Sequence, residues 1–288
     1  MKYLIYITAL LAFFGCNSFS KFVPEKYFTE GSEREFATAI YNGNSRKIKK
    51  MITDSIVDLN VSGEKGFSYL LYAVFVEKYN IVKILLEHGA DPNQLSIIKH
   101  PDGSIEKLTP LVCVCRNHWY SIKYIKLLVE KGANVNDTIV SPPLVSCIIH
   151  SGKDQKKVRY LIENGANINQ VFGDYTPMQH AVLSRGLDMV DLLWNYGADP
   201  LARHIKYVPG QVDLLWNYGA DPLYIGKKGN SLAYMVQKIV NKKLGTPEYV
   251  AHAQAIMNRL EKLGVKFPVT ITPPEKEKTT ITNSKSTE

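Results

Sequence analysis

The phrase Leu85-Leu86-Glu87-His88-Gly89-Ala90-Asp91-Pro92-Asn93 decides how this chain folds, because related phrases follow it. They occur at 127–136, 161–169 and 192–200, and their shared glycine stands at positions 89, 132, 165 and 197. The successive spacings are 43, 33 and 32 residues, and a period near 33 residues is typical of a helical solenoid. The pattern therefore predicts a stack of repeated units and argues against a closed enzyme fold.

Each unit carries residues that begin and end helices. Leu85 and Leu86 form an apolar pair at the end of a helix, and Gly89 can adopt the left-handed conformation that ends a helix without a Cβ clash. Thr109-Pro110 and Thr176-Pro177 each place a capping hydroxyl before a proline that suits the first helical turn. We therefore expect a turn and two helices in every unit.

These residues resemble the consensus of the ankyrin repeat family. The strongest matches are Thr176-Pro177-Met178-Gln179-His180-Ala181 with Gly197-Ala198-Asp199, and Thr109-Pro110-Leu111 with Gly132-Ala133-Asn134. The resemblance implies an all-α ankyrin-repeat solenoid, built of helix-turn-helix repeats with β-hairpin loops, over residues 31–268. It would hold about five to six repeats, with degenerate units at 36–60 and 231–264 capping its ends.

The N-terminus predicts export from the cell. Lys2 precedes an apolar run, Tyr3 to Phe14, that is too short to span a bilayer and fits a secretory signal over residues 1–15. The order Ala12-Phe13-Phe14-Gly15-Cys16 resembles a bacterial lipobox, which implies lipidation of Cys16, and Asn17 favours the outer membrane over the inner. An ordinary cleaved signal that leaves Cys16 free is the alternative.

The segments flanking the repeats differ from them in composition. Residues 16–30 read as a short tether between the lipid anchor and the repeats. Residues 269–288 consist largely of Thr, Pro, Lys and Glu, so they have too few apolar side chains to join a core and are predicted to form a disordered tail.

The remaining cysteines point to a core rather than to chemistry. Cys113, Cys115 and Cys147 fall on the first helices of the third and fourth repeats, where small side chains pack. We expect neighbouring repeats to hold them too far apart for a disulfide. One Cys-x-Cys without a second ligand pair does not make a metal site, so no metal and no cofactor are expected.

Motifs of catalysis are absent from the sequence. It contains no Gly-x-Ser-x-Gly elbow, no His-Glu-x-x-His and no phosphate loop. His180 occupies an apolar position of the ankyrin consensus, so we expect a packed histidine rather than a base. The chain is therefore predicted not to be an enzyme.

The formal net charge of +8 comes from scattered lysines rather than from one arginine-rich stripe. A solvated basic surface is the simplest interpretation. Because export separates the chain from nucleic acid, anionic lipid or an acidic protein is the more specific candidate partner.

The resemblance also proposes residues that bind a partner, because ankyrin proteins generally bind through their hairpin tips and the exposed ends of their first helices. The matching positions at helix ends are Phe75, Val76, Arg116, Asn117, Ile149, His150 and Leu183. Outward apolar side chains in adjacent repeats would form a continuous strip of the kind that marks an interface.

The long first spacing predicts a projecting finger. Residues 96–107 exceed the usual connection, and Pro101-Asp102-Gly103 is a strong turn signal between two short stretches able to pair as strands. Lys99, His100 and Asp102 are the binding candidates there. A neutral insertion is the alternative, because surface loops tolerate added length at small entropic cost.

One block of the chain is duplicated. Residues 190–201 recur unchanged at 212–223, an offset of 22 residues. We interpret this as a recent tandem duplication that supplies a second helix without its first. One copy would bulge out or displace the other, leaving Trp194 or Trp216 partly exposed and the last unit strained. A benign insertion is the alternative.

A lipid-anchored ankyrin solenoid without catalytic residues is most simply a protein that binds another protein. It resembles the ankyrin-repeat lipoproteins that act as immunity partners of type VI secretion lipase effectors. The resemblance implies that the chain binds and neutralises a phospholipase effector in the periplasm. The alternative is an envelope scaffold or chaperone that stabilises or activates a periplasmic enzyme.

Overall fold

The computed structural model describes residues 22–63, 65–99, 103–150, 154–173, 175–199 and 231–269. The described part is mostly helical, which confirms the predicted helical repeat fold. The chain divides into two compact units, Met1–Ile168 and Asn169–Glu288. The predicted signal at 1–15, Cys16, and residues 270–288 of the predicted tail lie outside the described residues.

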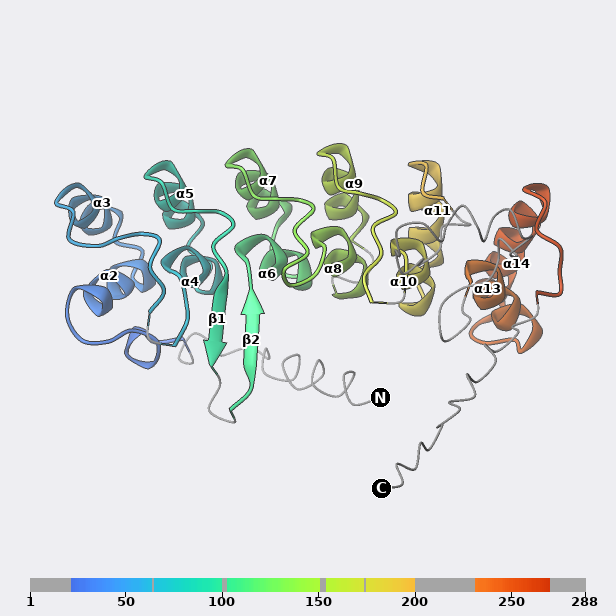
Figure 1. Ribbon diagram of the computed structural model, residues 1–288, viewed down its shortest axis with the longest axis horizontal. Helices are drawn as coiled ribbons and strands as arrows, with labels where there is room; N and C mark the ends of the chain where they lie inside the picture. The colour runs from blue at the N-terminus through green and yellow to red at the C-terminus, as the bar shows by residue number, and fades with distance from the viewer. Residues whose placement is uncertain are drawn as a thin grey trace, which may run out of the picture. The chain divides into compact units, whose positions relative to one another are not determined.

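The first unit consists of helix pairs and one hairpin. Its elements are η2 (Pro24–Lys26), α2 (Ser32–Tyr41), α3 (Ser45–Thr53), α4 (Tyr69–Phe75), α5 (Tyr79–Glu87), β1 (Ser96–Lys99), β2 (Ile105–Leu108), α6 (Pro110–Arg116), α7 (Ile122–Glu130), α8 (Pro143–His150) and α9 (Gln155–Glu163). Figure 1 shows α2, α4, α6 and α8 in one row and α3, α5, α7 and α9 in a second row beside it. The hairpin of β1 and β2 projects from this double row.

The second unit consists of two helix pairs. Its helices are α10 (Pro177–Leu183), α11 (Leu187–Asn195), α13 (Leu232–Asn241) and α14 (Pro247–Lys262). α13 packs on α10, and α14 packs on α11, so the last pair stacks directly on the pair that contains the first copy of the duplicated block.

The helix boundaries form where the sequence predicts them. The hydroxyl of Thr109 accepts from the amide of Val112 at 3.4 Å, and Thr176 forms a reciprocal capping box with Gln179. Gly89, Gly132, Gly165 and Gly197 all follow second helices with φ between 86° and 94°. Capping side chains and glycines near each boundary therefore determine where these helices begin and end.

The two rows of helices differ in burial. In α4, residues 69–74 are all buried, whereas α5 buries one face and leaves Asn80, Lys83 and Glu87 exposed. A short helix that is apolar on all sides is stable only inside a core. α4 therefore lies within the core of the first unit, and α5 packs one face against that core and turns the other to water.

A series of asparagines joins the loops of successive repeats in the first unit. The side chain of Asn93 donates to the carbonyl of Gly132 at 2.9 Å and accepts from the amide of Asn134 at 2.7 Å. Asn60 makes the same pair of bonds to Gly89 and Asp91, and Asn136 makes it to Gly165 and Asn167. Each amide side chain therefore satisfies two backbone groups of the next loop.

Packing begins before residue 31, within the segment that the sequence assigns to a tether. Phe28 is buried and stacks on Tyr69, with ring centroids 5.3 Å apart. The hydroxyl of Tyr72 donates to the carbonyl of Phe22 at 2.6 Å. Residues 22–28 therefore pack against the first two repeats.

The duplicated block is described only in part. Its first copy provides the C-terminal half of α11, in which Leu192 and Leu193 are buried and Trp194 is half-buried. The second copy at 212–223, with Trp216, lies outside the described residues. The expected displacement of one copy stays a prediction.

Candidate partner-binding surface

The predicted finger is an antiparallel hairpin with one exposed face. β1 pairs with β2 so that Ile97 lies opposite Lys107 and Lys99 opposite Ile105. These four side chains share the exposed face, on which Ile97 is 43% and Ile105 62% exposed. On the other face Ile98 and Leu108 are buried. The hairpin thus presents two isoleucines alternating with two lysines, while His100 and Asp102 lie outside the described residues.

The finger is held against the preceding loop by close backbone contact. Gly66 has φ +85°, and a Cβ added to it would lie 1.8 Å from the carbonyl oxygen of Ile97. Beside it, the buried hydroxyl of Ser96 donates to that of Ser68 at 3.2 Å and accepts from the Ser68 amide at 3.1 Å. Only glycine fits at position 66, so the finger is a positioned element of the fold.

The base of the finger contains a weakly satisfied guanidinium. Arg116 Nη1 lies 3.9 Å from Glu106 Oε1, and Nη2 donates to Ser141 Oγ at 3.5 Å. Arg116 Nε is buried without a hydrogen-bond partner in the described part of the chain. Burial lowers the pKa of this guanidinium, and the Glu106 carboxylate opposes that shift. The cation is therefore held in place with hydrogen-bonding capacity left over.

The expectation that Val76 points outward is wrong. Val76 is 2% exposed, and Phe75 is half-buried with its ring 5.3 Å from Phe22 and 5.2 Å from Phe67. α4 ends at Phe75, but the amide of Val76 still donates to the carbonyl of Tyr72, so Val76 continues the helical turn before the chain reverses at Glu77, whose φ is +56°. The predicted apolar strip therefore does not include Val76.

Asn117 serves a structural contact. Its side chain donates to the carbonyl of Cys113 at 2.8 Å, and its own carbonyl accepts from Lys157 Nζ at 2.8 Å. Lys157 is fully buried on α9. Asn117 thus links the end of α6 to the next repeat. The only sequence feature that could have indicated the burial of Lys157 is its place on an apolar helix face.

The other predicted helix-end residues are described in separate units. Ile149 and His150 end α8 in the first unit and are half-buried. Leu183 ends α10 in the second unit and is 50% exposed. That these residues bind a partner stays a prediction.

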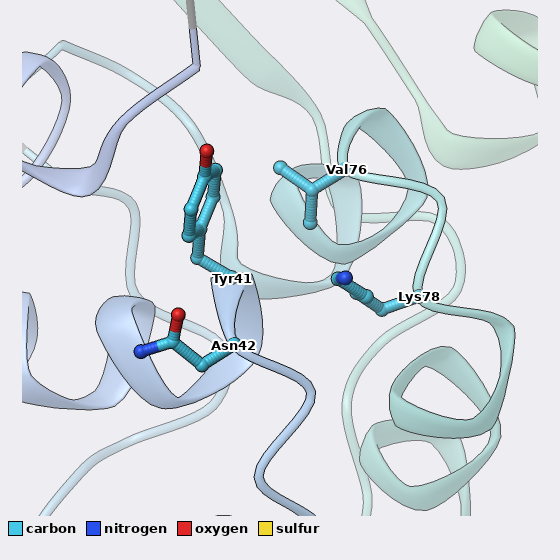
Figure 2. Close-up of a pocket in the computed structure, with 4 residues that line it drawn as sticks. All are labelled: Tyr41, Asn42, Val76 and Lys78. Carbon is cyan, nitrogen blue, oxygen red and sulfur yellow. The ribbon is translucent and has the colours of Figure 1, made fainter. Parts of the chain in front are cut away.

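A depression of about 400 Å³ lies at the ends of α2 and α4. Figure 2 shows its lining residues, Tyr41 and Asn42 from the first repeat and Val76 and Lys78 from the second. Val76 and Lys78 face Tyr41 across the opening. The four side chains include no carboxylate, thiol or imidazole.

The three described cysteines are buried, as the sequence predicts. Cys113, Cys115 and Cys147 are free thiols with almost no exposed surface. Burial raises the pKa of the Cys115 thiol, and the neighbouring Cys147 thiol adds to this shift. No disulfide joins these three cysteines, in keeping with the expectation that neighbouring repeats hold them too far apart for one.

The described residues contain no group of three or more His, Cys, Asp or Glu side chains able to hold a metal ion. His180 is 9% exposed, and its Nε2 donates to the carbonyl of Phe172 at 3.0 Å. Burial lowers the pKa of His180, which matches a packed, neutral histidine.

No helix in the described ranges has the length and apolar character needed to cross a bilayer.

A charged cluster in the second unit lies outside the residues that the sequence proposes for binding. Asp191 accepts from Arg259 Nη1 at 2.6 Å and hydrogen-bonds His252 Nε2 at 2.6 Å. The Arg259 guanidinium also lies 4.0 Å from the ring centroid of Trp194. His252 and Arg259 stand seven residues apart on α14, which places them on one helix face. In the sequence, only this seven-residue spacing of two basic side chains on one predicted helix could have indicated that they meet an aspartate.

Comparison with known families supports the repeats seen in the structure. Two segments match ankyrin repeat family models, residues 65–97 and residues 173–202. The first match covers α4, α5 and the start of β1, and the second covers α10 and α11. No curated protein matches the chain.

Proposed function

We propose that this ankyrin-repeat chain is a bacterial envelope lipoprotein that binds and neutralises a type VI secretion phospholipase effector. Its repeats are modules of protein-protein interaction. The finger carries this part of the proposal, because Ile97 and Ile105 remain exposed on a hairpin that Gly66 holds in place. Exposed apolar side chains on a rigid element are typical of a binding surface.

The envelope location rests on the sequence alone. The apolar run from Tyr3 to Phe14 and the lipobox-like end at Cys16 support export and lipidation. A lipid anchor would hold the repeats at the membrane that a phospholipase attacks. The outer membrane is the more favoured destination because asparagine, rather than aspartate, follows Cys16.

The location is tested by labelling cells with a radioactive fatty acid and fractionating their membranes. The chain with Cys16 should carry label in the membrane fraction, whereas Cys16→Ser should carry none. Equal release of both forms into the soluble fraction would contradict the anchor and favour an ordinary cleaved signal.

The binding function is tested by isolating the partner from envelope extract and titrating it with the mature chain. We expect a phospholipase whose activity disappears as one equivalent of the chain is added. A resident periplasmic enzyme whose stability or activity rises would instead establish the scaffold or chaperone. A phospholipase that is bound but not inhibited would also contradict immunity.

A further inference from the structure

We propose that the outer edge of β2 docks an extended strand of an acidic partner protein, which would add to the finger as its next strand. This inference deepens the proposed function by naming the mode of binding. It rests on that function only in taking the partner to be a protein.

The first step identifies which edge of the hairpin is already used. In antiparallel strands, alternate residues direct their N–H and C=O groups to opposite edges. The amide of Lys99 donates to the carbonyl of Lys65 at 3.3 Å, and the carbonyl of Ile97 lies against Gly66. The backbone groups of Ile97 and Lys99 therefore face the loop at 65–66, and this loop covers the outer edge of β1.

The second step follows from the register. Since Ile97 and Lys99 face away from β2, Ser96 and Ile98 face toward it, and they lie opposite Leu108 and Glu106. The backbone groups of Ile105 and Lys107 must then point away from β1. In the described part of the chain this sheet has two strands only, so those groups form an edge. Such an edge is a template for strand addition.

The third step concerns what fits beside this edge. Ile105 is 62% exposed and Lys107 is exposed on the same face, with Lys99 across from Ile105. The acid of β2, Glu106, is on the opposite face and lies 3.9 Å from Arg116. Charge complementarity therefore favours a strand that places a carboxylate beside Lys107 and an apolar side chain beside Ile105.

The fourth step concerns the cost of ordering. A short edge of two outward residues offers few hydrogen bonds, so it binds well only if it is already in its bound conformation. The hydroxyl pair of Ser68 and Ser96 is buried, and Gly66 admits the Ile97 carbonyl at close range. The hairpin is thus anchored on the repeat before any partner arrives.

The test uses amide hydrogen exchange on the whole mature chain with a synthetic peptide as the probe. In this peptide valine and glutamate alternate on one face of the strand, and threonine fills the other. Saturating peptide should slow exchange of the Ile105 and Lys107 amides about tenfold or more, as expected for new hydrogen bonds. The amides of Glu106 and Leu108, which already pair with β1, should not change.

Three results would overturn the proposal. The first is unchanged exchange at Ile105 and Lys107. The second is equal protection by a peptide with lysine in place of glutamate, because the charge argument would then fail. The third is protection that rises with protein concentration in the absence of peptide, which would assign the edge to a second copy of this chain.

A matched pair of variants separates the backbone from the side chain. Lys107→Ala removes the charge and keeps the outward amide, whereas Lys107→Pro removes both and is compatible with an edge position. We expect peptide affinity to fall about tenfold further in Lys107→Pro than in Lys107→Ala. Equal affinities would overturn the proposal.

Integrity of the hairpin is monitored through the amides of Ile98 and Glu106. A peptide N-methylated at alternate residues blocks the same hydrogen bonds without any change in the protein, and it should bind at least as weakly as the unmodified peptide binds Lys107→Pro. None of these measurements involves an effector or a membrane. Their failure would leave the immunity proposal standing, and failure of the phospholipase assay would leave the docking edge standing.

Discussion

Two junctions, one within each unit, are stabilised by different kinds of contact. The first joins the N-terminal helix pairs of the first unit, and the second joins the C-terminal helix pairs of the second unit. At the N-terminal end, Phe28 and Tyr72 pack ring against ring, with centroids 5.0 Å apart. At the C-terminal end, α11 is joined to α14 by Asp191, His252 and Arg259. One junction is mainly apolar, and the other is partly ionic.

Because of this difference, salt and pH should affect the stability of the two junctions differently. Apolar contact depends on area removed from water and is nearly indifferent to moderate salt and pH. Ion pairs between half-exposed side chains are screened by salt. In a repeat protein each helix pair contacts only its neighbours, so the two junctions can respond separately.

The largest effect is expected for Tyr72→Ala in the N-terminal junction. Tyr72 is fully buried, and its loss leaves a cavity, so the unit should lose about 3–5 kcal/mol of stability. Tyr72→Phe, which keeps the ring and removes the bond to Phe22, should lose about 1 kcal/mol. Exchange of amides in α2 and α4 measures both losses, and a strong dependence on salt would contradict an apolar junction.

A smaller effect is expected for Asp191→Ala in the C-terminal junction. About a third of the Asp191 and Arg259 side chains is exposed, so the loss should be about 1 kcal/mol at low salt and should shrink at high salt. The matched control is Asp188→Ala, since Asp188 is more exposed and lies 3.6 Å from His252. Amide exchange in α14 measures the loss. Equal losses in Asp191→Ala and Asp188→Ala would contradict the idea that the ion pair of Asp191 stabilises this junction.

Arg259→Lys sharpens the comparison further. Lysine keeps the charge but lacks the planar group that lies over Trp194 at 4.0 Å. The expected loss is about 0.5–1 kcal/mol, again read from amide exchange in α14. Arg159→Lys on α9 is the control, because Arg159 is exposed and should tolerate the change. If α14 exchanges no faster in Arg259→Lys, the stacked guanidinium contributes nothing.

The smallest effect expected is the response of the second unit to mild acid through His180. Burial lowers the pKa of folded His180 from its ordinary value of 6.5. Below pH 6.5 the unfolded chain therefore binds more protons than the folded chain, so stability should decline as the pH falls and recover above it. His180→Gln keeps a neutral donor and should flatten this part of the pH profile. An unchanged profile would place the acid sensitivity elsewhere.

Much of the fold follows from the sequence because its signals are local. Thr109 and Thr176 cap the helices that follow them, and Gly89 and Gly197 end the helices before them, since each acts within one turn. The finger was also predictable, because a turn signal between two short pairing stretches needs no distant partner. The candidate surface followed only in part.

The errors share a cause in long-range packing. Val76 is buried because the phase of α4 at its end depends on what packs there, and one residue of phase reverses a side chain's exposure. Phe22 and Phe28 look like tether residues until Tyr69 and Tyr72 are placed beside them.

The sequence by itself determined the repeated helix pairs, their caps and the presence of the finger, because backbone preferences and hydrogen bonds within a few residues decide these features. Tertiary structure decided which side chains remain at the surface. Burial is a property of contacts between repeats, and so the exposed face of Ile97, Lys99, Ile105 and Lys107 emerges only when Gly66 receives the Ile97 carbonyl and the register of the hairpin is set.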